Sequence, residues 1–221
     1  MKKIILFTIV ILSSYIFAFS QSYRFELPPG ENKIIIQDKP TNLEGSPFLN
    51  DDWQLGTIFF KNGDTIPTIK LRFNVHNGEM QYLHEEKTYA IGASENIKEI
   101  IIDGHHFEFL YYHDEGKFKK SFFEVLYADK TSLLQLHFTV ILPTNFNPAL
   151  NSGNKNDRII HKMKYYAKIG DKIVEIDRRG KNFISAFGEK EALISKYIKD
   201  NNISLKEEAD LIYLIRYSNT L

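Results

Sequence analysis

Cysteine is absent from this chain of 221 residues. Without thiols there can be no disulfide framework, no thiolate zinc site and no cysteine nucleophile. A lipid anchor on a post-cleavage cysteine is excluded for the same reason, so the chain is not a lipoprotein. Side-chain packing must hold the protein together, and a hydrophobic fraction of 43% is enough for the core of one globular domain.

An excess of charge of either sign is also missing, because 28 basic residues balance 28 acidic ones. Proteins that bind nucleic acids usually show a basic excess or a concentrated basic face. Here the densest basic spots are the short runs Lys117–Lys120 and Asp177–Gly180. We therefore expect no nucleic acid among the partners.

Residues Met1 to Ser20 have the three parts of a secretory signal peptide: two lysines, an apolar run from Ile4 to Leu12, and small residues before Gln21. A transmembrane anchor is the alternative, but Ser13-Ser14 interrupts the run, and a spanning helix needs ~20 apolar residues. We predict cleavage near Ser20/Gln21 and export to the periplasm or the medium. The mature chain would have no transmembrane segment and would be soluble or peripherally held.

Strand signals dominate from Trp53 onward. Turn dipeptides punctuate β-rich runs, and Asn-Gly and Asp-Gly suit type I′ turns because both central residues have positive φ. Two runs, Pro67–Val75 and Leu134–Leu142, alternate apolar and polar residues, which is typical of a sheet with one buried face. The turn dipeptides are Asn62-Gly63, Asn77-Gly78, Asp103-Gly104 and Gly170-Asp171.

Two segments depart from this alternation. Residues 143–157 are rich in Asn, Pro and Gly, and a loop of this length is either functional or disordered, with disorder the favoured interpretation. After Gly180 the apolar period becomes helical, with a possible interruption at Gly188. Ser204 and Glu207 form a capping-box pattern that predicts a second helix over Leu205–Ser218.

The predicted fold is therefore α+β: an antiparallel β-meander of about eight to ten strands, curled, barrel-like or sandwich-like, with a C-terminal helical hairpin packed on it. The expected division is a signal peptide (1–20), N-terminal strands at Tyr23–Leu27 and Lys33–Gln37 with an irregular connection (21–52), the β domain (53–180) and the helices (181–221).

The pattern resembles small exported proteins of Bacteroidota-type Gram-negative bacteria that have no assigned function. The resemblance rests on Gly56, Asn62-Gly63-Asp64, Tyr165-Tyr166 and the helical pair after Phe183, and covers most of Trp53–Leu221. It implies an envelope location and provides no catalytic or cofactor-binding residues.

Motifs for catalysis and cofactors are missing. The chain has no G-x-G-x-x-G, Walker, G-x-S-x-G or H-E-x-x-H pattern. Adjacent carboxylates such as Asp114-Glu115 point to opposite sides of a strand, which does not suit a glycosidase pair. We expect no cofactor, no metal and no catalytic residue.

Polar side chains on two predicted strands are the candidates for ligand or partner contact. His106 and Glu108 share one face after the Asp103-Gly104 turn, and a site there would need His84, His137 or Glu124 from neighbouring strands. Gln135, His137 and Thr139 form a polar face on the Leu134–Leu142 run. For both groups the favoured interpretation is an exposed sheet surface.

Aromatic residues are abundant, with 17 Phe and 12 Tyr. Phe107, Phe109 and Tyr111 share one strand face, and we interpret them as core. As the lining of a barrel mouth they would instead hold an apolar ligand. The predicted function is an exported, non-catalytic envelope protein that binds a partner. A small β-barrel carrier of a lipid-like ligand is the alternative, and an unrecognised enzyme comes third.

Overall fold

The computed structural model describes residues 33–34, 43–92, 94–114 and 116–221. The predicted signal peptide and the predicted strand Tyr23–Leu27 lie outside these residues. Of the predicted strand Lys33–Gln37, only the first two residues are described, and they are in a strand.

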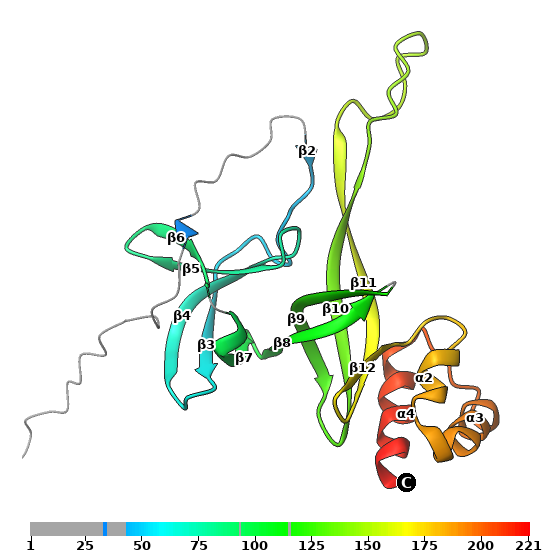
Figure 1. Ribbon diagram of the computed structural model, residues 1–221. Helices are drawn as coiled ribbons and strands as arrows, with labels where there is room; N and C mark the ends of the chain where they lie inside the picture. The colour runs from blue at the N-terminus through cyan, green and yellow to red at the C-terminus, as the bar shows by residue number, and fades with distance from the viewer. Residues whose placement is uncertain (1–32, 35–42, 93, 115) are drawn as a thin grey trace, which may run out of the picture.

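Within the described residues the chain forms one curled sheet (Figure 1) in which the only parallel pair joins β2 and β11. The spatial order is β1-β6-β5-β4-β3-β7-β8-β9-β10-β11-β12, with β2 beside β11. This confirms the predicted α+β class and its antiparallel meander. The strands are β1 Lys33–Ile34, β2 Leu43–Glu44, β3 Gln54–Phe60, β4 Thr65–Asn74, β5 Glu79–His84, β6 Lys87–Ala90, β7 Ile97–Ile102, β8 His105–Asp114, β9 Lys117–Tyr127, β10 Thr131–Leu142, β11 Asp157–Ile169 and β12 Lys172–Glu175.

The C-terminal region is helical and lies beside the β10–β12 end of the sheet (Figure 1). Gly188 has a φ of 59°, a conformation that interrupts a helix, so the first predicted helix is divided there. The helical elements, with a short turn earlier in the chain, are η2 Ser94–Asn96, α2 Lys181–Ser185, η3 Gly188–Lys190, α3 Glu191–Asp200 and α4 Glu208–Thr220.

The predicted capping box at Ser204 is wrong. Helix α4 begins at Glu208, and Glu207, its extended N-cap residue, makes no side-chain capping bond. Asp210 instead accepts a hydrogen bond of 2.7 Å from the backbone N–H of Ser204. The segment before α4 is thus fixed by a carboxylate of the first helical turn rather than by the expected serine.

Two of the three predicted type I′ turns are also wrong. Only Asp103 and Gly104 both have positive φ, whereas at Asn62-Gly63 and Asn77-Gly78 the glycine alone does. A type I′-like pair occurs instead at Glu85 and Glu86, with φ of 47° and 60°, between β5 and β6. No glycine marks that turn, so residue type alone did not reveal it.

Gly56 allows two strands to approach β3 closely. A Cβ atom at this position would lie 2.4 Å from the carbonyl oxygen of Ile101 and 2.7 Å from Cδ1 of Leu71. Pairing of β3 with β4 is irregular at the same point, between Gly56 and Ile58. A residue without a side chain is needed because strands on both sides of β3 occupy the space.

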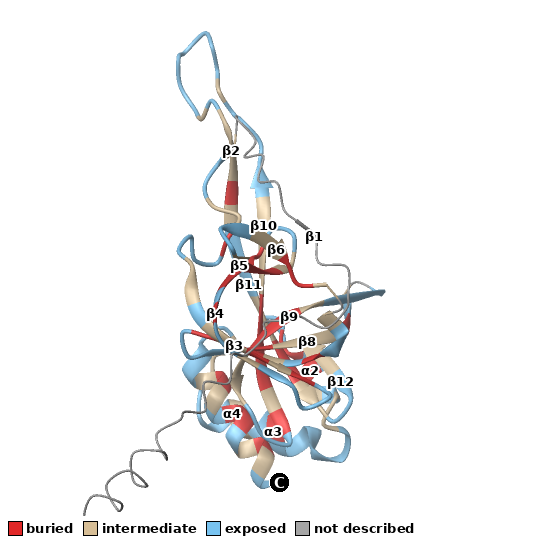
Figure 2. Cartoon of the chain, turned by 90° about the vertical axis from the view of Figure 1, so that its left-hand side faces the viewer, coloured by how far each residue is buried: buried red, intermediate tan, exposed pale blue. Residues whose placement is uncertain are grey.

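Three apolar clusters form the core. The first lies on one face of β3–β9 and includes Leu71, Phe73, Phe107 and Phe122. The second joins Leu133 and Ala167 of the sheet to the helices through Phe183, Ile194, Leu211, Leu214 and Ile215. The third lies on β8–β11 and consists of Tyr112, Phe123, Leu134, Leu136 and Tyr166. Figure 2 shows these buried residues running through the centre of the sheet and the inner sides of the helices.

Strands β9 and β10 diverge after a short contact. They pair only through Glu124–Tyr127 and Leu133–Gln135, although both continue for several residues beyond Glu124 and Gln135. Strands β10 and β11 then pair along twelve positions and rise beyond the other strands as a long hairpin, which we call the arm (Figure 1).

The tip of the arm, residues 143–156, is closed by its own hydrogen bonds. Asn147 and Ser152 exchange backbone bonds of 2.8 and 3.3 Å, and the side chain of Asp157 accepts the N–H of Thr144 at 2.7 Å. The favoured expectation of disorder is therefore not what the structure describes. Asn and Gly suit this segment because their side chains or backbone satisfy tight turns.

Candidate functional site

Polar side chains from three strands meet on one face of the sheet, between the first and second apolar clusters. Phe107 of β8 and Gln135 of β10 both lie opposite Glu124 of β9, and opposed residues of antiparallel strands share a face. His137 and Thr139 follow Gln135 on that face because side chains alternate along a strand. We call the set Glu124, Gln135, His137 and Thr139 the polar stripe, and His105 of β8 contacts it.

Glu124 is the centre of the stripe. One carboxylate oxygen accepts a hydrogen bond from Nδ1 of His105 at 2.5 Å, and the other accepts one from Nε2 of His137 at 2.7 Å. The Glu124 side chain is 9% exposed, His137 is 14% exposed and His105 is 61% exposed. A buried carboxylate therefore holds two imidazole rings, one covered and one facing solvent.

The pKa of Glu124 is lowered from its ordinary value of 4.5. Burial acts to raise it, but the hydrogen bonds from His137 and His105, together with their charges, outweigh burial. Glu124 is thus an anion at neutral pH and accepts both bonds. With each ring donating to the carboxylate, the second nitrogen of His105 remains directed away from Glu124.

Further contacts extend the stripe to the segment before β3 and to the β4–β5 turn. The hydroxyl of Thr139 lies 2.8 Å from Nδ1 of His76, and Nε2 of His161 donates to the backbone oxygen of Ser46 at 2.8 Å. The amide of Gln135 contacts the sulfur of Met163. Residues distant in sequence therefore contact this end of the β10–β11 face, where Met163 and His161 stay exposed.

Tyr165 closes the stripe on the helical side. It lies opposite Gln135 in the β10–β11 register. Burial raises the pKa of its phenol, and the negative charges of Glu208, Glu207 and Glu124 raise it further. The hydroxyl is therefore protonated at neutral pH and serves as a neutral polar group beside Glu124.

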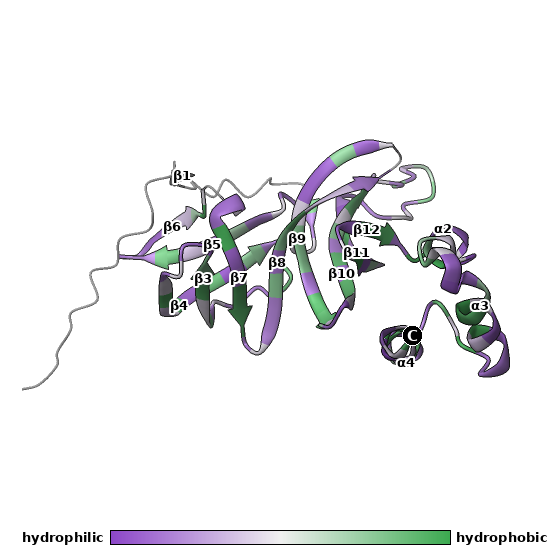
Figure 3. Ribbon diagram, turned by 60° about the horizontal axis from the view of Figure 1, so that its bottom comes forward, coloured by the Kyte–Doolittle hydropathy of each residue, from purple (hydrophilic) through white to green (hydrophobic). Residues whose placement is uncertain are grey.

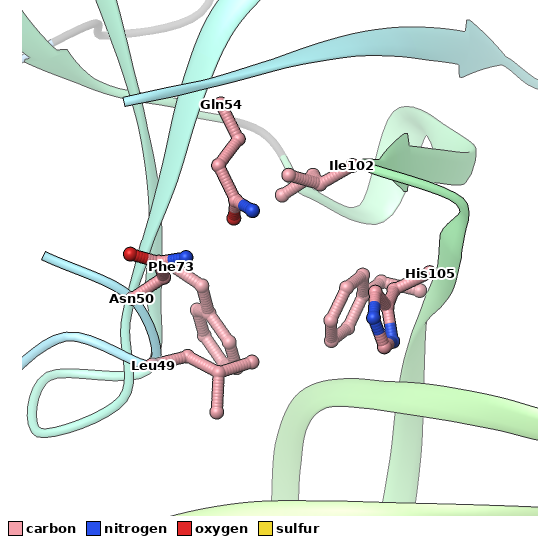
Figure 4. Close-up of a pocket in the computed structure, with 7 residues that line it drawn as sticks. Leu49, Asn50, Gln54, Phe73, Ile102 and His105 are labelled. Atoms are coloured by element: carbon pink, nitrogen blue, oxygen red, sulfur yellow. The ribbon is translucent and has the colours of Figure 1, made fainter. Parts of the chain in front are cut away.

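A small pocket opens next to His105. Its walls are mostly apolar, with Phe73, Ile102 and Phe107 buried beneath, and Asn50, Gln54 and His105 supply polar atoms (Figure 4). The space available to water-sized molecules is about 30 Å³, room for a few waters. Pockets that hold drug-sized ligands are roughly tenfold larger, so this one suits a small group.

His106 and Glu108 do not join the stripe. They share the opposite face, as the alternation predicted, but they do not contact each other. His106 bonds to Glu99 at 2.6 Å through Nδ1, and Glu108 bonds to Lys168 at 2.9 Å. His106 is 47% exposed, so the exposed-surface interpretation holds for this residue.

For Gln135 and His137 the expectation of an exposed face is wrong. Gln135 is 6% exposed and the His137 side chain 14%. Gln135 and His137 are covered because the second cluster packs against β10 and β11 on the helical side of the stripe. The first cluster and His76 lie on the same face of the sheet, at the side of the stripe away from the helices. From the sequence, Glu124 is predicted only as a possible neighbour of a site at His106. His105 is not predicted, because alternation places His106, and not His105, on the face of Glu108.

No group of three or more His, Asp or Glu side chains within 43–92, 94–114 and 116–221 is arranged to hold a metal ion. In the stripe, both oxygens of Glu124 are already bonded to imidazoles. Chemically, the arrangement provides one imidazole oriented by a carboxylate at the edge of a small pocket. Such a group can exchange protons or bind a polar atom.

None of the helices in the described part of the chain is both long and apolar enough to cross a membrane. No family model, no curated protein and no solved structure matches this chain.

Proposed function

We propose that this chain is an exported, non-catalytic envelope protein that binds a partner protein, with the arm as its working surface. The arm extends beyond the other strands and carries exposed apolar side chains. Leu150 at the tip is 72% exposed, and Ile141 and Leu142 on β10 are 47% and 41% exposed. These side chains lie on both faces of β10 and at the tip, and apolar groups exposed on a projecting element support an interaction site there.

The hydrogen bonds within the tip support this proposal, because an ordered tip loses less conformational entropy on binding than a disordered one. Asn145 and Asn154 join its two sides, with a bond of 2.7 Å from the Asn154 N–H to the Asn145 side chain. Gly153 permits this approach, since a Cβ there would lie 2.5 Å from the Asn145 carbonyl oxygen. The apolar side chains are thus presented on a preformed hairpin.

The experiment compares variants in their ability to capture a partner protein from an envelope extract. The captured protein is then crosslinked to the arm. Leu150→Ser combined with Leu142→Ser should lose a partner that the unaltered chain captures. Leu55→Ser, at a position 61% exposed on β3, is the matched control and should keep it. Equal capture by all three chains, or capture of nothing reproducible, contradicts the arm as working surface.

Export is tested separately by mass spectrometry of the mature N-terminus. A chain that begins at about Gln21 is expected. An intact Met1 on material from the cell envelope would contradict cleavage and leave the arm proposal to be judged by the capture experiment alone.

A specific observation favours an enzyme as the second candidate. Three polar side chains, His105, Glu124 and His137, converge beside the pocket, and a carboxylate-oriented imidazole is a general base in many hydrolases. The chain offers a matched pair for the test, because His105 and its neighbour His106 lie on opposite faces. A hydrolytic activity lost in His105→Gln and kept in His106→Gln would overturn the non-catalytic proposal.

The carrier of an apolar ligand remains the alternative to partner binding. It requires an interior space lined by aromatic rings, whereas Phe107, Phe122 and Phe123 are at most 1% exposed and pack into the clusters. Native mass spectrometry of the purified chain distinguishes the two. A retained lipid-sized mass would favour the carrier, and an unliganded mass favours the partner-binding module.

A further inference from the structure

The end of the β8–β9 hairpin exposes aromatic rings. Phe118 is 66% exposed and Tyr111 is 47% exposed. Their rings are nearly parallel, with an interplanar angle of 9° and centroids 5.4 Å apart. Phe109 lies edge-on to Tyr111 at 6.0 Å and continues the row toward the core. Elsewhere in the described sheet rings of this size are largely buried, so this exposed pair is an exception.

The exposure follows from the divergence of β9 and β10. Alternation places Phe109, Tyr111 and Phe118 on the same face as Glu124. Beyond Glu124, however, β9 has no partner strand other than β8 among the described strands. The face of the hairpin end that carries the rings consequently has no covering layer, whereas Tyr112 and Asp114 on the other face contact β11. Figure 2 shows the hairpin end as an exposed extension at the side of the molecule.

Lysines alternate with aromatic residues along β9, with Lys120 on the face of the rings and Lys117 and Lys119 on the other face. Lys117, Lys119 and Lys120 are exposed and contribute three positive charges within four residues. Lys120 Nζ lies 5.8 Å from the centroid of Phe109, and Lys119 pairs with Asp114 at 2.6 Å. Asp114 is also approached by Lys164 of β11 at 3.4 Å, so its charge is compensated by the body. Figure 3 shows this end of the hairpin with hydrophilic segments on either side of a hydrophobic one.

We propose that the end of the β8–β9 hairpin docks on the surface of an anionic lipid bilayer. Aromatic rings partition into the headgroup region of a bilayer, and lysines beside them are attracted to anionic lipids. The ring pair and its lysines provide both features on one projecting hairpin. This surface is distinct from the arm, so vesicle binding can be tested independently of partner binding.

A protein or nucleic-acid partner fits these observations less well. Affinity for a protein is concentrated in pockets that are desolvated at their centre, and the described pocket lies at His105, at the opposite end of β8 from this hairpin end. A nucleic-acid site is disfavoured by the balance of 28 basic and 28 acidic residues in the chain. Each lysine near an anionic bilayer strengthens binding roughly fivefold, which suits a peripheral and reversible attachment.

The test is sedimentation of the purified mature chain with vesicles of phosphatidylcholine alone or with 30% phosphatidylglycerol, at low and high salt. We expect binding to the anionic vesicles only. Tyr111→Ser/Phe118→Ser should weaken it by about tenfold at either salt concentration. Lys117→Gln/Lys120→Gln should weaken it by about tenfold at low salt and little at high salt, because salt screens exposed charges.

Tyr213→Ser is the matched control, since this residue is 58% exposed on α4, away from the hairpin. It should bind as the unaltered chain does, and circular dichroism should show that each variant remains folded. Binding that is unchanged in both double variants, or absent from anionic vesicles altogether, overturns the inference. The inference is also overturned if the chain binds a single-stranded oligonucleotide through these lysines and does not bind vesicles. The surface would then be a nucleic-acid site.

Discussion

The β3–β8 half of the sheet and the β9–β12 half use the same alternation of side chains but differ in what covers them. In the first half one face holds the apolar cluster of Leu71, Phe73 and Phe107. In the second half both faces are covered, one by Tyr112, Phe123 and Tyr166 and the other by the helices. Polar positions are therefore buried in the second half, and they are also buried on the opposite face of the first half, where Arg72 is 9% and Gln81 1% exposed. Buried polar groups of this kind need partners.

The polar stripe shows how this requirement is met. Glu124 accepts bonds from two histidines, and Gln135 contacts the sulfur of Met163. By contrast, Arg72 of the first half, 9% exposed, is covered by the rings of Phe48 and Trp53 and has a buried Nε without a partner. Burial lowers the pKa of Arg72, partly opposed by the charge of Asp51. Each half thus leaves one buried side-chain atom without a hydrogen-bond partner among the described residues, Nε of Arg72 in the first and the hydroxyl of Tyr166 in the second.

The largest effect is expected in the apolar cluster of the first half. Phe107→Ala should lower the free energy of unfolding by about 4 kcal/mol, because it leaves a cavity beside Phe73 and Phe122. Urea denaturation measures the loss. Phe118→Ala, at an exposed position on the next strand, should change stability by no more than about 0.5 kcal/mol. If Phe107→Ala and Phe118→Ala lowered the free energy of unfolding by similar amounts, the first cluster would not be the main core.

A smaller effect tests the close approach of strands around Gly56. Gly56→Ala should destabilise the protein by about 2 kcal/mol, because the added methyl group meets the Ile101 carbonyl oxygen and the Leu71 side chain. Thermal unfolding followed by circular dichroism provides the measurement. A melting temperature equal to that of the unaltered chain would mean that β3, β4 and β7 are not packed as closely as described.

The polar stripe is tested by Glu124→Gln, which should cost about 2 kcal/mol at pH 7 by weakening two charge-assisted hydrogen bonds. Because the pKa of Glu124 is lower folded than unfolded, its contribution is complete above about 4.5 and is lost as the pH falls through the folded value. The difference from the unaltered chain should therefore shrink below pH 4.5 in urea titrations.

Glu99→Gln is the control for that measurement. Glu99 bonds to His106 on the opposite face and is 31% exposed, so its removal should cost about 0.5 kcal/mol. If Glu99→Gln and Glu124→Gln lost equal stability, burial would not distinguish the two histidine–carboxylate contacts.

The smallest effect is expected at the end of the stripe. Thr139→Val removes the hydroxyl that bonds to His76 while keeping the branched side chain, and should cost about 0.5 kcal/mol. Hydrogen exchange of the β4–β5 turn is the more sensitive readout and should become faster. Unaltered exchange there would indicate that this turn is held by other contacts.

Much of the fold was predictable because its signals are local. Alternation located β4 and β10, glycine located most turns, and the change of period located the helices. The failures were at positions where distant contacts decide the local geometry. Asp210 rather than Ser204 fixes the start of α4, and Glu85-Glu86 adopts positive φ because β5 and β6 require a two-residue connection.

The sequence by itself determined which side chains share a face of each strand, because that depends only on neighbouring residues along the chain. It correctly placed His106 on one strand face with Glu108, and Gln135 on one strand face with His137. Tertiary structure decided which faces became buried and that His105, rather than His106, meets Glu124, a residue 19 positions away. The reason is that the strand register and the packing of helices on the sheet are set by the whole chain, whereas alternation is set within each strand.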